Sequence, residues 1–365
     1  MRKPLTIIMV LCLMVGFAPG YCRAAENASA ASVKLEDAIN LALTNQKVLK
    51  TSQLDVDAAK YAMDQAWDNN TAALRRTYDP ATGMYVSTAT GSDPQGSVYS
   101  TYSAWLTKNK SYDAQVDTVV LSTYQKYFAV TTAINNLEAS RLTSQQDSEK
   151  ARIADLSYQL GMTTSSDSDK ARMQANSSQS NYLAAQKALD QAYRSFALYV
   201  GLPEDSQPTL DSSIEYKPVT IDDPDTMINS IADSSPSVWM ANQTVILASE
   251  TYGMSNSYTI EDINKKKNSY ALQTAQENAR TTVRSYYVKL KGYEDSYASV
   301  EQGLKIAQQT LKITQLKYDL GLATKVNVMT DEAALVSAKN TYNNLVLQHE
   351  IYTMAFNKPW AFSGN

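Results

Sequence analysis

The heptapeptide YQLGMTT at residues 158–164 returns almost unchanged as YDLGLAT at residues 318–324, 160 positions further along the chain. Other residues recur at the same spacing. They are Tyr127 and Tyr287, Ile153 and Ile313, Leu156 and Leu316, Tyr182 and Tyr342, and Phe196 and Phe356. Repetition over this length indicates one supersecondary unit that the chain uses twice.

An earlier pair of segments indicates where each unit begins. Residues 35–46 (LEDAINLALTNQ) resemble residues 225–236 (DTMINSIADSSP), and Ile39 pairs with Ile228 at a spacing of 189. The spacing then falls from 189 to 160, so between these landmarks the first unit holds 189 − 160 = 29 residues that the second lacks. We therefore expect a first helical repeat at 25–215 and a second at 216–365.

Heptad spacing predicts that each unit consists of long helices. In the second unit, five residues recur every seven positions: Leu290, Tyr297, Leu304, Leu311 and Tyr318. After each repeated turn, apolar and small residues step by three and four. They are Ala175, Ser178, Tyr182, Ala185, Leu189, Ala192 and Phe196, and their partners Leu335, Ala338, Tyr342, Leu345, His349, Tyr352 and Phe356. This spacing is typical of a coiled-coil seam. The predicted fold is mostly α, with long antiparallel helical hairpins that form a coiled-coil stalk.

The repeated turns are predicted to be the tips of these hairpins. Gly161 and Gly321 follow the last seam residues of one helix, where glycine readily adopts the left-handed C-terminal cap. Ser166 and Asp167 are expected to be N-caps of the next helix in the first unit. A helix over 113–160 would reach roughly 70 Å from the turn.

The N-terminus predicts export. Residues 1–24 combine a basic start, an apolar run and small residues before a cleavage site, as a secretory signal peptide does. Both cysteines, Cys12 and Cys22, lie in this segment. Cys22 is a candidate for lipidation, although such sites usually follow a small residue and Tyr21 is bulky. Beyond residue 24 the chain keeps 30 of its 33 basic residues and all 37 acidic ones, a net charge of about −7 that disfavours nucleic acid as a partner.

The sequence offers little chemistry for an enzyme. His349 is its only histidine and takes a seam position, where a packed or pore-facing role is expected. The sequence shows no phosphate-binding glycine loop and no metal-ligand spacing. We therefore expect neither catalysis nor a cofactor nor a metal.

The order of these motifs resembles the TolC family of outer-membrane efflux and type I secretion channels. The resemblance rests on LEDAINLAL, on YQLGMTTSSD and YDLGLATKVNV, and on the ending ALYVGLP of the first unit, and it covers nearly the whole chain after residue 24. It implies a homotrimer that forms a helical tunnel, topped by a β-barrel to which each repeat gives two strands. It also implies a periplasmic adaptor (membrane fusion) protein and an inner-membrane pump as partners.

The resemblance assigns a role to the repeated turns. It places Gly161, Thr164, Gly321 and Thr324 at hairpin tips that face the adaptor. The alternative is that the glycines only cap helices.

The resemblance also implies an acidic ring after the second turn, which would narrow the tunnel entrance. Asp167 fits such a position in the first unit, but the matching residue of the second is Asn327. Asp331 and Glu332 are displaced by a residue or more, and one residue turns a side chain by about 100° around a helix. They are either entrance residues or part of a solvated face.

Residues 78–112 are predicted to be non-helical. Segments 84–90 and 97–106 form a candidate strand pair with a turn at 92–96, and an exposed loop is the alternative. The candidate membrane-facing aromatics are Tyr85, Tyr99, Tyr102 and Trp105. Segment 251–262 is too short for two spanning strands, so the chain would be a divergent member with a reduced or missing β-barrel and at most one short β-hairpin. We expect the exported chain to be recoverable without detergent.

These features favour an envelope-spanning efflux or type I secretion conduit in the outer membrane or periplasm. The alternative is a coiled-coil envelope scaffold that binds partners and conducts nothing.

Overall fold

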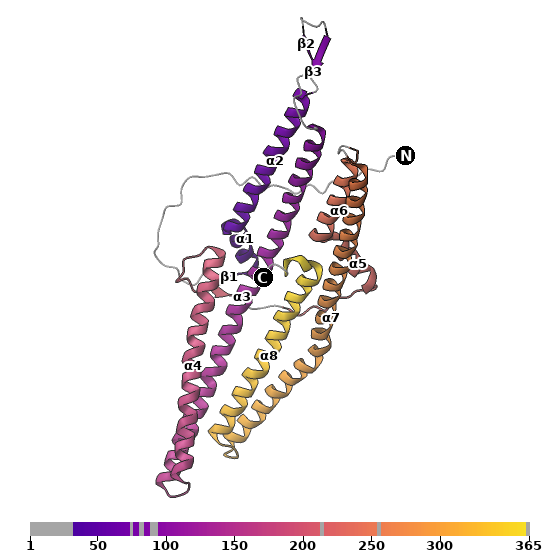
Figure 1. The fold of residues 1–365 in the computed structure, drawn as a ribbon. Coiled ribbons are helices and arrows are strands. Elements are labelled where there is room, and N and C mark those ends of the chain that lie inside the picture. Colours follow the sequence, from indigo (N-terminus) through magenta and orange to yellow (C-terminus); the bar gives the residue numbers. More distant parts are fainter. Residues whose placement is uncertain are drawn as a thin grey trace.

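The computed structural model describes residues 32–73, 76–79, 84–87, 94–211, 215–253 and 257–362. The expected signal peptide, with Cys22, lies outside these residues. The described chain is mostly α-helical, as predicted, and forms an elongated body in which the long helices run lengthwise (Figure 1).

The helices follow one another in the same order in both halves. The first half holds β1 (Ser32–Val33), α1 (Leu35–Asn45), α2 (Lys47–Ala73), β2 (Arg76–Asp79), β3 (Met84–Ser87), α3 (Pro94–Gln159), α4 (Ser165–Val200) and β4 (Thr209–Leu210). The second holds α5 (Pro224–Ser234), α6 (Pro236–Glu250), α7 (Tyr258–Asp319), α8 (Lys325–Asn357) and the short 3-10 helix η1 (Pro359–Ala361). A short helix, a medium helix and a long helical hairpin thus occur twice.

The difference in length between the halves is spread over one arm. Helix α2 has 27 residues against 15 in α6, and α3 has 66 against 62 in α7. The connection from α2 to α3 covers 74–93, whereas the connection from α6 to α7 covers only 251–257. All three differences lengthen the α2–α3 arm, which carries the β2–β3 hairpin at one end of the molecule (Figure 1).

The predicted seam lies between α7 and α8. Leu290 is buried, and the hydroxyl oxygens of Tyr297 and Tyr342 are 3.2 Å apart across the two helices. The rings of Tyr293 and Tyr352 stack with their centroids 5.4 Å apart. Burial decreases toward the tip, where Tyr318 is exposed. The part of the seam nearest the middle of the molecule therefore holds the hairpin together.

Each half has its own core where the short helices cross the long hairpin. In the first half, α1, α3 and α4 pack together with residues of α8 and η1. In the second, α5 and α6 pack on α7 and α8. Equivalent aromatic pairs lie at the two centres, Tyr127 with Phe196 and Tyr287 with Phe356, each with ring centroids 5.8 Å apart.

The strand prediction for 97–106 is wrong, and so is the prediction that 94–112 are non-helical, because these residues belong to α3. Pro94 begins that helix, a position where its missing N–H costs nothing, so residues 94–96 of the expected turn are helical as well, and 92–93 lie outside the described residues. Serine and threonine hydroxyls bond to the carbonyl one turn earlier, as from Thr101 to Ser97 and from Thr107 to Ser103, each at 2.8 Å. These bonds and the packing on α2 suit a helix despite the β-branched and aromatic composition.

A short β-hairpin is nevertheless present. Met84–Ser87 pairs with Arg76–Asp79 in antiparallel register, with Tyr78 opposite Tyr85. Each described strand has four residues, fewer than the roughly nine to eleven of a tilted membrane-spanning strand. A second and unpredicted pair, β1 with β4, is parallel and two residues long.

We expect Gly201→Ala to destabilise the first core strongly. Gly201 has a φ of +82°, and a Cβ built there lies 2.6 Å from the Asn45 side chain, whose amide donates to the Val200 carbonyl at 3.0 Å. Left-handed strain and overpacking together should cost about 3 kcal/mol in the free energy of unfolding.

Chemical denaturation measures this cost, and Gly303→Ala is the matched control. Gly303 is interior to α7 and an added Cβ meets nothing within 4 Å, so alanine there should stabilise by up to about 1 kcal/mol. Equal effects at the two positions would contradict the role of Gly201.

Candidate functional site: the paired hairpin tips

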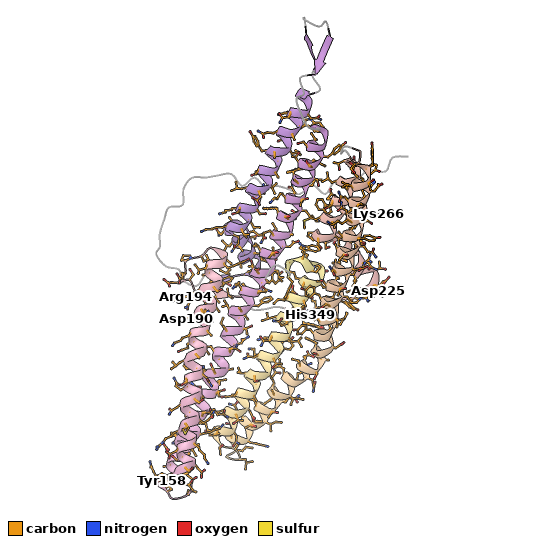
Figure 2. All side chains as sticks on the ribbon, in the orientation of Figure 1. Tyr158, Asp190, Arg194, Asp225, Lys266 and His349 are labelled. Carbon is orange, nitrogen blue, oxygen red and sulfur yellow. The ribbon has the colours of Figure 1, made fainter. Side chains whose placement is uncertain are left out.

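The two repeated turns lie at the same end of the molecule, opposite the β2–β3 hairpin (Figure 1). One connects α3 to α4 and the other connects α7 to α8. Figure 2 shows Tyr158 at the α3–α4 tip, far from His349 in the middle of the body.

Both glycines end their helices in the left-handed conformation, with φ of +71° at Gly161 and +74° at Gly321. In the first tip, the N–H of Met162 donates to the Ser157 carbonyl at 2.8 Å, and the N–H of Gly161 donates to Tyr158 at 2.9 Å. The second tip repeats both bonds at Leu322 and Gly321, at 2.7 and 2.9 Å. This pair of bonds is the Schellman motif, which satisfies the last helix carbonyls.

A threonine is the N-cap of the next helix in each hairpin, so the prediction of Ser166 and Asp167 as N-caps is wrong. Thr164 Oγ1 accepts from the N–H of Asp167, and Thr324 Oγ1 accepts from the N–H of Asn327, both at 3.2 Å. Ser166 and Asp167 lie in the first turn of α4. The stretch TTSSD offers several capping side chains, and Thr164, whose backbone is extended, is the one that caps the helix.

Asp167 and Asn327 complete reciprocal caps. Thr164 Oγ1 donates to the Asp167 carboxylate at 2.7 Å, and this bond lowers the pKa of Asp167 below its usual value. Asn327 Oδ1 accepts from the N–H of Thr324 at 2.9 Å. Both side chains turn back onto their own helix end, which explains why an acid in one tip corresponds to an amide in the other.

The tips also expose large apolar side chains, which the sequence argument missed. They are Leu160, Met162, Leu320 and Leu322, with exposed fractions between 66 and 76 %. Each pair flanks its glycine, and a Cβ added at either glycine meets nothing within 4 Å. The sequence signal was LGM in one turn and LGL in the other. Neither glycine is needed for close packing inside the chain. The four exposed side chains beside them give the tips an apolar surface.

Asp331 and Glu332 lie in the first turns of α8 and are half-buried. Asp331 lines a hollow of about 270 Å³ with Asn327 and Thr330. A hydrogen bond to Glu138 is the main cause that raises the pKa of Arg141 on α3. The negative charge of Glu332 makes a smaller contribution in the same direction. The structure thus groups Asp331 with Asn327, whereas Asp167 belongs to the other tip. An entrance role for these residues stays a prediction.

Polar contacts fix the two hairpins side by side. Gln146 of α3 donates to Thr330 of α8, and the Asn340 amide donates to the Asn135 carbonyl at 3.0 Å. Such contacts are directional, so they set the register of α3 against α8. The two tips are therefore held at a defined offset.

The candidate membrane-facing aromatics are split between two elements. Tyr85 lies on β3, whereas Tyr99, Tyr102 and Trp105 lie on α3 and not on a strand. The indole N–H of Trp105 is buried and has no hydrogen-bond partner among the described residues. Membrane contact by this group stays a prediction.

His349 is a packed residue in a buried polar cluster. Its Nε2 lies 3.4 Å from Glu294 Oε1, and its ring lies 4.8 Å from that of Tyr216. Burial alone would raise the pKa of Glu294, but hydrogen bonds from Lys291, the Val219 N–H and His349 outweigh it and lower that pKa. Through Tyr216 and Val219, the cluster holds the segment that precedes α5 against α7 and α8.

Across the described residues, no three His, Cys, Asp or Glu side chains are grouped as a metal site would require. A search of the same residues finds no helix with the length and apolar character to span a membrane.

We expect Gly161→Ala and Gly321→Ala each to cost about 1 kcal/mol of local helix-end stability. The only penalty is the left-handed backbone, because space for the Cβ is free. Hydrogen exchange of the amides of Met162 and Leu322 measures it, since these protons close the Schellman bonds. Gly292→Ala in α7 is the matched control, and unchanged exchange in both tip variants would contradict the capping role.

No family model matches this sequence, and no curated protein matches it either. Solved structures do match its fold. They include the outer membrane protein VceC of Vibrio cholerae, at a TM-score of 0.62 and 14% identity, covering 91% of this chain and 96% of that one. They also include the outer membrane channel CmeC of Campylobacter jejuni, at 0.64 and 14%, covering 90% and 85%. A third is the open state of the outer membrane channel MtrE of Neisseria gonorrhoeae, at 0.61 and 12%, covering 90% and 88%.

Proposed function

From the premise that this chain has the fold of TolC-like outer-membrane channels, we propose that it is an exported envelope conduit for efflux or type I secretion. The observation that carries the proposal is the pair of equivalent tips at one end of the molecule. They share one backbone motif and expose four apolar side chains. An apolar surface held on a rigid capped turn suits docking to a partner protein. The proposed partners are a periplasmic adaptor protein and an inner-membrane pump.

Self-association is proposed from the apolar residues left on the stalk. Three exposed residues recur every seven positions along α7 and its C-cap, namely Ile306, Ile313 and Leu320. Ile153 of α3 and Leu160, which directly follows α3, repeat the pattern. A heptad row that faces solvent in one chain is suited to bury itself against another copy. A homotrimer would place six hairpins around one axis, which leaves a central passage.

The conduit itself would be passive, in agreement with the expectation that the chain is not an enzyme. Helices around a lumen supply a path, and the pump supplies the free energy. The tips would point toward the inner membrane and the β2–β3 end toward the outer membrane. A non-conducting scaffold would use the same apolar rows but would enclose no passage.

Deletion of the gene in its own host tests the proposal. We expect the deletion strain to accumulate toxic dyes and detergents or to lose a secreted protein from the medium, and the full-length chain to restore the phenotype. A strain that lost neither function while its envelope spacing changed would support the scaffold instead.

A further inference from the structure

The α2–α3 arm carries a hollow that is lined in part by residues for which the second half has no equivalent. Helix α6 ends at Glu250, and the residue 189 positions before it is Tyr61. Residues 62–73 of α2 therefore belong to the surplus of the first half. Four of them line a cavity of about 640 Å³ that α2 shares with α3, beside the β2–β3 end. This volume is in the range of small-molecule sites.

The lining is aromatic and acidic. Met63, Trp67, Tyr99 and Tyr102 surround it together with buried Val98, and Asp64 and Asn70 supply the polar groups. Trp67 is 61% exposed and Tyr102 is 47% exposed. Two large rings on neighbouring helices thus present surface to a hollow rather than to a core.

Asp64 is the one charged side chain among the described residues that line the hollow. No described residue forms an ion pair or hydrogen bond with the Asp64 side chain, and the described residues of the lining include no lysine or arginine. Aromatic faces attract cations through their ring quadrupole, and a nearby carboxylate adds a charge of the favourable sign. A flat aromatic cation satisfies both features, because its rings stack on indole and phenol while its charge faces Asp64.

We propose that this hollow is a binding site for planar aromatic cations. The site is separate from the hairpin tips and does not depend on the conduit function. Trp67 and Tyr102 provide the stacking faces, and Asp64 selects for positive charge.

The test uses the exported full-length chain with N-methylacridinium as the probe and acridine as its neutral match at mildly alkaline pH. Fluorescence titration should show that the cation binds more tightly than acridine. Asp64→Asn should weaken binding of the cation about fivefold and leave acridine unchanged. Trp67→Ala should weaken both about tenfold, and Trp67→Phe should restore part of the loss.

The matched control is Asp57→Asn, seven residues earlier on the same helix, which removes the same charge without touching the hollow. It should leave both affinities unchanged, and helical circular dichroism should be the same in all variants. Equal affinities for acridine and the cation, or binding unaffected by Asp64→Asn and Trp67→Ala, would overturn the proposal. Failure to bind the cation, with co-sedimentation on phosphatidylcholine vesicles that Trp67→Ala abolishes, would instead make this a membrane-contact surface.

Discussion

Replacing Leu160, Met162, Leu320 and Leu322 together by serine should leave the chain folded and abolish export. The four side chains are mostly exposed, so their loss costs the isolated chain little. Against a docked partner, each would bury apolar area worth about 1.5–3 kcal/mol. Allowing for incomplete burial, we expect at least a hundredfold loss in affinity for the adaptor. Complementation of the deletion strain measures the effect on export.

A matched control separates the tips from exposed apolar residues in general. Leu54 of α2 is 67% exposed and lies far from both turns. Leu54→Ser should therefore complement the deletion fully. Full complementation by the quadruple variant would show that the tips do not dock the partner, whereas loss of helical signal in that variant would show that the four side chains stabilise the chain itself.

Tyr127→Ala should give the largest loss of stability of any single change discussed for this chain. The ring is fully buried against Phe196, and its hydroxyl faces the carbonyl oxygens of Val33 at 2.9 Å and Asp211 at 2.8 Å. Truncation leaves a cavity and removes the hydroxyl that contacts the ends of β1 and β4. Together these losses should cost about 3–5 kcal/mol in the free energy of unfolding. Tyr127→Phe keeps the ring and should cost about 1–2 kcal/mol.

The pH dependence of unfolding checks the buried hydroxyl separately. Burial raises the pKa of Tyr127 from its usual 10 to about 12. Because the unfolded chain loses this proton at lower pH, the folded state should lose stability as pH rises from about 10 toward 12. Tyr127→Phe should lack this part of the decline. Tyr287→Phe is the control, since no described residue bonds to its hydroxyl, and an equal change there would contradict the assignment.

The repeats made much of this fold predictable. Seam residues such as Leu290 and Tyr297 lie on one side of one helix, so their spacing is read directly along the chain. The tips could be predicted for the same reason, because the helix end at Gly161 is formed by backbone hydrogen bonds within its own turn. Conversely, residues 97–106 could be assigned wrongly because their composition suits a strand, and it is contact with α2 that favours the helix.

Features that depend on distant residues were not predictable. The hydroxyl of Tyr127 contacts the carbonyl oxygens of Val33 and Asp211, which lie 94 and 84 residues away in the sequence. No local sequence pattern predicts such contacts. The choice of Thr164 rather than Ser166 or Asp167 as N-cap is a shift of two or three residues within a run of side chains that can all cap a helix. The leucines of the tips were visible in the turn sequence. Their exposure was not, because it depends on whether another part of the chain covers them in the fold.

Single-particle electron microscopy of the purified exported chain tests the conduit most directly. We expect three copies around one axis, with α3–α4 and α7–α8 hairpins alternating around an open passage and all six tips at one end. A monomer, or an assembly whose helices pack on the axis and leave no passage, would contradict the conduit and support the scaffold.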